Sequence, residues 1–181
     1  MKFSTLSILL VWACLSFSQL HAEVVGRPDS LGRGAYIIKQ LVEVPVSPEE
    51  AYDLMTGDIS GWWDHSFSDK PHKLYIEPKP GGHFMEIFDE SGDGVQHATV
   101  IYARRGVMLR MDGPLGLSGM AVSNVVTWLY EKSETGCKVS AEIHILGEVT
   151  DRFAAIGDKV WHHFLTEQFK PYAEAKNIQK K

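Results

Sequence analysis

Hydrophobic and polar positions alternate with a short period over most of the chain, and this pattern predicts β-strands. Residues 35–46, "AYIIKQLVEVPV", are rich in β-branched and aromatic side chains and predict a first strand. Beyond residue 72, further segments of the same kind are separated by turn sequences such as "KPGG" and "SGDG". Regular strand–turn–strand spacing predicts one antiparallel sheet that curls on itself.

A helical pattern follows the first strand. Ser47 can cap a helix, Pro48 suits its first position, and Glu50 completes a capping box. Apolar residues then recur at helical spacing, namely Tyr52, Met55, Ile59 and Trp62. Because Gly57 and Gly61 interrupt this pattern, we expect two short helices instead of one long helix.

The last part of the chain predicts a long helix, from residue 152 to about residue 176. Its apolar stripe recurs every three or four residues and comprises Phe153, Ile156, Val160, Trp161, Phe164, Gln168 and Tyr172. Gly157 weakens the helix locally, and Pro171 predicts a kink or a restart near its C-terminal end.

The first 22 residues predict a cleaved secretory signal peptide. They begin with the basic Lys2, continue as an apolar run and end at the small residue Ala22. Two alternatives are a retained membrane anchor and a lipoprotein signal in which Cys14 is lipidated. Cleavage after Ala22 implies a periplasmic or secreted protein without a stable membrane span. It leaves a flexible leader at 23–34, a folded domain at 35–176 and a tail at 177–181.

The composition excludes some classes of function. The formal net charge is -5 and charges of both signs are mixed along the chain, which argues against nucleic-acid binding. Cys137 is the only cysteine beyond the predicted signal peptide, so no internal disulfide is expected. Because no histidine lies beside it in the sequence, we expect a half-buried thiol at a strand start and not a nucleophile.

Together these patterns predict an α+β fold. The order is a strand, two short helices, a series of strands and a long helix. A strongly curved sheet must fill its concave face, and the C-terminal helix is the only predicted element long enough to do so. Such a helix leaves space beside it, where an apolar cavity can hold a small molecule.

Several motifs, in this order, resemble one known superfamily. They are "VEVPVSPEEAYDLM", "WWDHSFS", "EPKPGGHFME", "LRMDGPLG" and "TWLYEKSETGCKVSAEI". They are similar to the START-like or SRPBCC superfamily, which has the helix-grip fold of the birch pollen allergen. Within it they resemble the bacterial polyketide cyclase-like or heat-shock-ATPase-activator-like branch. The resemblance covers residues 35–176 and implies about six or seven antiparallel strands wrapped around the C-terminal helix.

The resemblance implies a cavity between sheet and helix, but not one activity, because one fold serves many functions. We expect an exported protein that binds a small hydrophobic or amphipathic ligand, lipid-like or polyketide-like, and needs no cofactor. One alternative is a cyclase- or aromatase-like enzyme that uses polar cavity residues for acid–base chemistry. Another is a module that binds a protein partner through the aromatic end of the helix. Export argues against the activation of a cytosolic chaperone.

Residues 61–72, "GWWDHSFSDKPH", form what we call the connector. They include Asp64, His65, Asp69 and His72 beside two tryptophans. A metal site needs three or four converging ligands, and the helical spacing of two histidines four residues apart is absent here. We therefore predict no metal site. The connector is expected to lead from the short helices into the sheet and to border the mouth of the cavity.

The predicted ligand contacts are mostly aromatic. Adjacent side chains on a helix point about 100° apart, so one of Trp62 and Trp63 can face the cavity while the other packs in the core. Both can equally pack as core residues. On the C-terminal helix, His163 flanks the apolar stripe whereas His162 faces solvent. The complete predicted set is Trp62, Trp63, His65, Phe67, Trp128, Trp161, His163 and Phe164.

The candidates for catalysis are His65, Glu86 and His97. His65 lies in a segment that resembles a recurring motif of the superfamily and is expected as a polar group near the cavity. Glu86 and His97 lie on neighbouring predicted strands and form an acid–base pair if the register allows it. The simpler alternative, which we favour, is an exposed cross-strand pair. The sequence contains no nucleophile motif or phosphate-binding loop, so a dedicated hydrolase is not supported.

Overall fold

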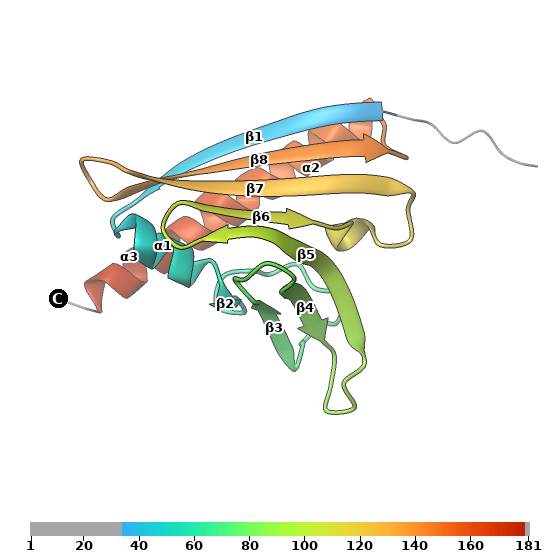
Figure 1. Ribbon diagram of the computed structural model, residues 1–181, viewed down its shortest axis with the longest axis horizontal. Coiled ribbons are helices and arrows are strands. Elements are labelled where there is room, and N and C mark those ends of the chain that lie inside the picture. The colour runs from blue at the N-terminus through green and yellow to red at the C-terminus, as the bar shows by residue number, and fades with distance from the viewer. Residues whose placement is uncertain (1–33, 180–181) are drawn as a thin grey trace, which may run out of the picture. The chain divides into compact units, whose positions relative to one another are not determined.

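A computed structural model describes residues 34–179 (Figure 1). The predicted signal peptide with Cys14, nearly all of the leader and the last two residues lie outside this range. The described elements are β1 (Gly34–Val44), α1 (Pro48–Leu54), β2 (Gly57–Asp58), β3 (Lys73–Ile76), β4 (His83–Ile87), β5 (Gly94–Arg104), β6 (Met108–Asp112), η1 (Leu115–Leu117), β7 (Val122–Lys132), β8 (Cys137–Gly147), α2 (Asp151–His162), η2 (His163–Phe169) and α3 (Lys170–Ile178).

The strands form one antiparallel sheet in the order β1-β8-β7-β6-β5-β4-β3-β2. The sheet is curved and not closed, and with the C-terminal helix it has the α+β architecture of a helix-grip fold. It holds 8 strands against the six or seven expected, because the two-residue β2 adds to one edge. The predicted alternation is confirmed on β8, where Val139, Ala141 and Ile143 are buried and the residues between them are not.

The C-terminal helix consists of three consecutive segments, α2, η2 and α3, and crosses the sheet behind β7 and β8 in the view of Figure 1. All three segments contact β1. The helix packs an apolar side against the sheet, as an amphipathic helix does. Among residues 34–179, no helix is long and apolar enough to cross a membrane.

The apolar stripe of this helix differs from the predicted one beyond Phe164. The prediction placed Gln168 and Tyr172 on the stripe, but the structure buries Phe169 and Ala173 and leaves the other two half-buried. The reason is that η2 is π-helical, with hydrogen bonds from residue i to residue i+5 instead of i+4. The residue that continues the stripe after Phe164 is therefore Phe169, five positions on.

Helix α1 begins as the sequence predicts. The Glu50 N–H donates to Ser47 Oγ at 3.2 Å, and the Ser47 N–H donates to Glu50 Oε2 at 3.0 Å, which completes the capping box. The prediction of a second short helix is wrong. Gly57 adopts a left-handed φ of 69° and pairs with Ile76 in the sheet, so the chain leaves the helical path there.

A single turn follows, in which the N–H groups of Trp62 and Trp63 both donate to Ile59 O. The connector then passes directly under the C-terminal helix. A Cβ atom on Gly61 would lie 2.7 Å from the Tyr172 ring, so any larger residue there would require this ring to shift. The connector is thus held between the end of the helix and the sheet.

Cys137 is fully buried at the start of β8, whereas a half-buried thiol was expected. Burial raises the pKa of the Cys137 thiol to about 11. The thiol is therefore protonated at neutral pH and unsuited to act as a nucleophile.

Candidate ligand cavity

A cavity of about 810 Å³ opens between the C-terminal helix, the connector and the sheet. Its lining is mainly apolar and includes Leu115, Leu117, Ile145, Phe153, Val160 and Trp161. Leu115, in η1, has a φ of 53°, which a bulky side chain rarely adopts. This volume and lining are typical of sites for small organic ligands.

The connector forms one wall of the cavity. The Trp63 ring stacks on Phe164, with ring centres 3.9 Å apart and planes 18° apart. The same indole meets Phe84 and Trp161 edge-on, and its N–H donates to His65 O at 2.8 Å. Trp63 therefore joins the connector to both the helix and the sheet.

Glu86 of β4 binds the connector from inside the sheet, and we call Glu86, His97, Phe67 and Ser68 the buried anchor. The carboxylate is 0% exposed. It accepts the N–H groups of Phe67 at 2.9 Å and Ser68 at 2.8 Å, the Ser68 hydroxyl at 3.0 Å and His97 Nε2 at 3.1 Å. Burial raises the pKa of Glu86, but these hydrogen bonds lower it more, so the pKa lies below its ordinary value of 4.5.

His97 reaches this carboxylate because of a β-bulge. Met85 of β4 pairs with Gln96, but the preceding residue, Phe84, pairs with Ala98, so His97 is an extra residue on β5. Both His97 and Ala98 consequently point inward and are buried. The exposed Glu86–His97 pair favoured from the sequence is thus wrong, and the pair lies inside the protein.

Two polar side chains are left to face the cavity. A carboxylate can only accept a hydrogen bond, so Nε2 of His97 donates to Glu86, and in this tautomer Nδ1 is an acceptor. Asn124 of β7 also lines the cavity, and its buried Oδ1 has no hydrogen-bond partner among the described residues. Both groups are buried and offer polar contacts in a lining that is mainly apolar and that also includes Asp64, His65 and Ser66 of the connector.

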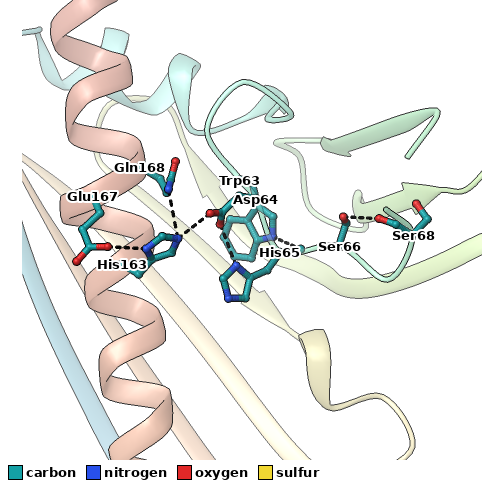
Figure 2. Close-up of polar contacts among 8 residues, drawn as sticks. All are labelled: Trp63, Asp64, His65, Ser66, Ser68, His163, Glu167 and Gln168. Carbon is teal, nitrogen blue, oxygen red and sulfur yellow. Dashed lines mark hydrogen bonds and ion pairs between the residues drawn. The ribbon is translucent and has the colours of Figure 1, made fainter. Parts of the chain in front are cut away.

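A third group, which we call the mouth cluster, comprises Asp64, His65, His163 and Glu167 (Figure 2). Asp64 Oδ1 lies 2.8 Å from His65 Nδ1, and Asp64 Oδ2 lies 2.7 Å from His163 Nε2. The other nitrogen of His163 lies 2.7 Å from Glu167, one helical turn away. These four side chains are partly or largely exposed.

The charges of the mouth cluster shift one another. Hydrogen bonds to Glu167 and Asp64 raise the pKa of His163 above its ordinary value of 6.5. Partial burial raises the pKa of Asp64, but the hydrogen bonds from His163 and His65 lower it by more, so the pKa lies below its ordinary value of 3.8.

The structure separates the predicted ligand-binding residues into three groups. Trp63, His65, Phe67, Trp161 and Phe164 line the cavity. His163 lies beside them in the mouth cluster.

Trp62 and Trp128 were also predicted to face the cavity, but both lie in the core instead. Trp62 donates its indole N–H to Leu54 O at 3.0 Å and packs against Trp128 and Phe169. Trp62 meets the ring of Trp63 edge-on, with ring centres 5.4 Å apart, so it packs behind the residue that lines the cavity.

The predicted catalytic residues are only partly brought together. Glu86 and His97 form one buried pair, whereas His65 contacts Asp64, His163 and Phe164 at the mouth. Asn124 was missed. Its signal in the sequence is one amide side chain at the start of the apolar segment "NVVTWLY".

A comparison with protein-family models gave no match, and neither did one with curated protein sequences. Solved structures do match. A protein of unknown function from Staphylococcus aureus is 13% identical, with a TM-score of 0.56 over 81% of this chain and 98% of that chain. The Aha1 dimer of Colwellia psychrerythraea gives 18% identity and a TM-score of 0.54 over 77% of this chain and 96% of that chain.

A protein from the dynemicin biosynthetic locus, DynU16, is 15% identical, with a TM-score of 0.55 over 76% of this chain and 47% of that longer chain. At such identities the likeness concerns the fold alone. The chain therefore has a helix-grip fold, as its motifs predict.

Proposed function

We propose that this protein is exported and binds a small amphipathic ligand in the cavity between sheet and C-terminal helix. The apolar body of the ligand lies against Leu117, Ile145 and Phe153, and its hydroxyl-bearing end contacts Asn124 and His97. Lipid-like and polyketide-like molecules with a hydroxyl group have this chemistry. Its support is the cavity itself, whose volume of about 810 Å³ suits such a molecule.

The observation that carries this proposal is Asn124, a cavity-lining residue whose Oδ1 has no hydrogen-bond partner among residues 34–179. A buried polar atom without a hydrogen bond costs roughly 1–3 kcal/mol. A ligand hydroxyl that donates to it removes this cost on binding. His97 Nδ1 can accept a second hydrogen bond from the ligand, because the Nε2–H of His97 already donates to Glu86.

Asn124→Leu tests the proposal, with two opposite effects expected. It replaces an unsatisfied amide by an apolar side chain of similar size, so it should raise the melting temperature of the ligand-free protein. It should also weaken the binding of a hydroxylated ligand at least tenfold. Ser123→Ala, on the same strand but exposed, is the matched control and should change neither quantity.

The experiment uses residues 23–181, purified from a heterologous host. Native mass spectrometry should show a co-purified lipid-sized mass. Thermal shift with fatty acids, sterols and phenolic polyketides should then identify a stabilising class. An empty protein that responds to none of them contradicts ligand binding. An Asn124→Leu variant that binds as tightly as the parent contradicts the polar contact.

Export rests on the pattern of residues 1–22 and has its own test. When the full chain is expressed in a bacterial host, the exported protein should begin at Glu23. Retention in the cytoplasm with an intact N-terminus contradicts the cleaved signal. A protein that begins with a lipidated Cys14 supports the lipoprotein alternative instead.

The Glu86–His97 pair favours a second candidate function, that of a cyclase- or aromatase-like enzyme. A carboxylate that holds one imidazole nitrogen protonated leaves the other as a general base facing the cavity. His97→Gln should then abolish turnover of a cyclisable ketone while ligand binding persists. Turnover that survives His97→Gln contradicts this candidate.

A further inference from the structure

The mouth cluster brings together donors that are distant in the sequence. Asp64 and His163 are 99 residues apart, one on the connector and the other on the C-terminal helix. One donor atom from each of Asp64, His65 and His163 lies within 4.8 Å of the other two (Figure 2). No metal site was predicted from the sequence, because nothing in the connector alone indicates that three or four ligands converge and the helical spacing of two histidines is absent; the structure adds His163 from the helix.

We propose that Asp64, His65 and His163 bind one divalent transition-metal ion of the zinc class at the mouth of the cavity. Two imidazole nitrogens and one carboxylate oxygen are a ligand set that Zn²⁺ and its neighbours in the transition series accept. Three protein ligands leave a fourth position for water or for an oxygen of a ligand.

The arrangement around His163 supports this assignment. Its Nδ1 lies 2.7 Å from Glu167, and its Nε2 lies 2.7 Å from Asp64, so two carboxylates face the two nitrogens of one ring. In a metal-bound state Glu167 accepts the Nδ1–H and leaves the Nε2 lone pair for the ion. A carboxylate behind a coordinating histidine is a recurring feature of metal sites, because it orients the ring and makes it a stronger ligand.

The charge of the cluster points the same way. Asp64 and Glu167 pair only with histidines among the described residues, and no lysine or arginine forms an ion pair with either. With both imidazoles neutral the group carries two negative charges, which a divalent ion compensates. Binding replaces the protons that bridge Asp64 to the two imidazoles.

The backbone around His163 is also unusual. His163 is the first residue of the π-helical segment η2, and such segments occur often at functional sites. Gln168 lies five residues after His163, and its side-chain amide nitrogen is 3.3 Å from His163 Nε2, the nitrogen that also faces Asp64. Asp64 and His65 also line the cavity, so an ion bound here lies at its opening.

The test is titration of the tag-free mature chain, stripped with a chelator, with Zn²⁺ by calorimetry and with Co²⁺ by absorption spectroscopy. We expect one ion per chain and the visible bands of a four-coordinate Co²⁺ site. His163→Ala and Asp64→Asn should each weaken binding at least tenfold. Glu167→Gln, which removes the orienting carboxylate, should weaken it roughly 10–100-fold.

His162→Ala is the matched control, since His162 is adjacent on the same helix but exposed and outside the cluster. It should leave the affinity for Zn²⁺ unchanged. Far-UV circular dichroism checks that every variant folds. Substoichiometric binding, or an equal loss of affinity in His162→Ala and His163→Ala, overturns the proposal.

Discussion

The connector is fastened at two points that differ in burial and in the groups they use. At the buried anchor, a carboxylate inside the sheet accepts two backbone N–H groups, from Phe67 and Ser68, together with His97. At the mouth cluster, the partly exposed Asp64 meets the side chains of His65 and His163. The first joins the connector to β4 and β5, and the second joins it to the helix.

The difference separates two tasks. Hydrogen bonds to backbone N–H groups fix the path of the chain, and an unsatisfied buried donor is costly. Contacts between exposed side chains contribute little to stability, and their geometry can change by rotation about side-chain bonds alone. The buried anchor therefore sets the shape of the cavity mouth, while the mouth cluster is free to rearrange around an ion or a ligand.

The largest expected effect is that of Glu86→Ala. It leaves His97 and two backbone donors without an acceptor, so the free energy of unfolding should fall by about 3–5 kcal/mol. Urea denaturation measures this change. Glu142→Ala is the control, because that carboxylate is exposed, and its loss should change stability by no more than about 0.5 kcal/mol. Equal losses of unfolding free energy in the two variants would show that the buried anchor stabilises the protein no more than an exposed ion pair does.

A smaller effect is expected from acid. The pKa of Glu86 is lowered in the folded protein, so its contribution to stability is complete above the ordinary value of 4.5. That contribution is lost as the pH falls below 4.5 and through the lowered pKa. Urea midpoints measured at several pH values should therefore decline in this range, and less steeply in Glu86→Gln. An unchanged slope in Glu86→Gln assigns the acid sensitivity to other carboxylates.

The smallest effect is expected at the mouth cluster without metal. A double-mutant cycle with Asp64→Asn and His163→Gln, in the presence of a chelator, should give a coupling energy of about 0.2–1 kcal/mol. This coupling should decrease at high salt, because the pair is partly exposed. A coupling of several kcal/mol, insensitive to salt, would remove the contrast between the two fastenings.

The sequence predicts those parts of the fold that depend on local patterns. The capping box at Ser47 and the alternation along β8 follow from neighbouring residues, and both are confirmed. The order of the motifs also indicated the helix-grip fold. Each of these signals lies within a few positions of the element that it specifies.

The site depends on departures from regular periods, which local patterns do not show. A bulge turns His97 inward beside Ala98, so strict alternation misplaces it. The approach of His163 to Asp64 depends on how the helix crosses the connector. Asn124 lines the cavity, and its Oδ1 lacks a partner in the described part of the chain, because of residues brought together by the fold and not because of any neighbour in sequence.

The π-helical segment η2 determines which residues of the following helix, α3, face the core. If the same residues wound as a continuous α-helix through His163–Phe169, everything beyond them would turn by about 100° and move forward by about 1.5 Å. Ala173 would then leave the core and Tyr172 would no longer lie over Gly61. The π-helical hydrogen bonds thus keep in phase the half of the helix that faces the cavity and the half that closes the core.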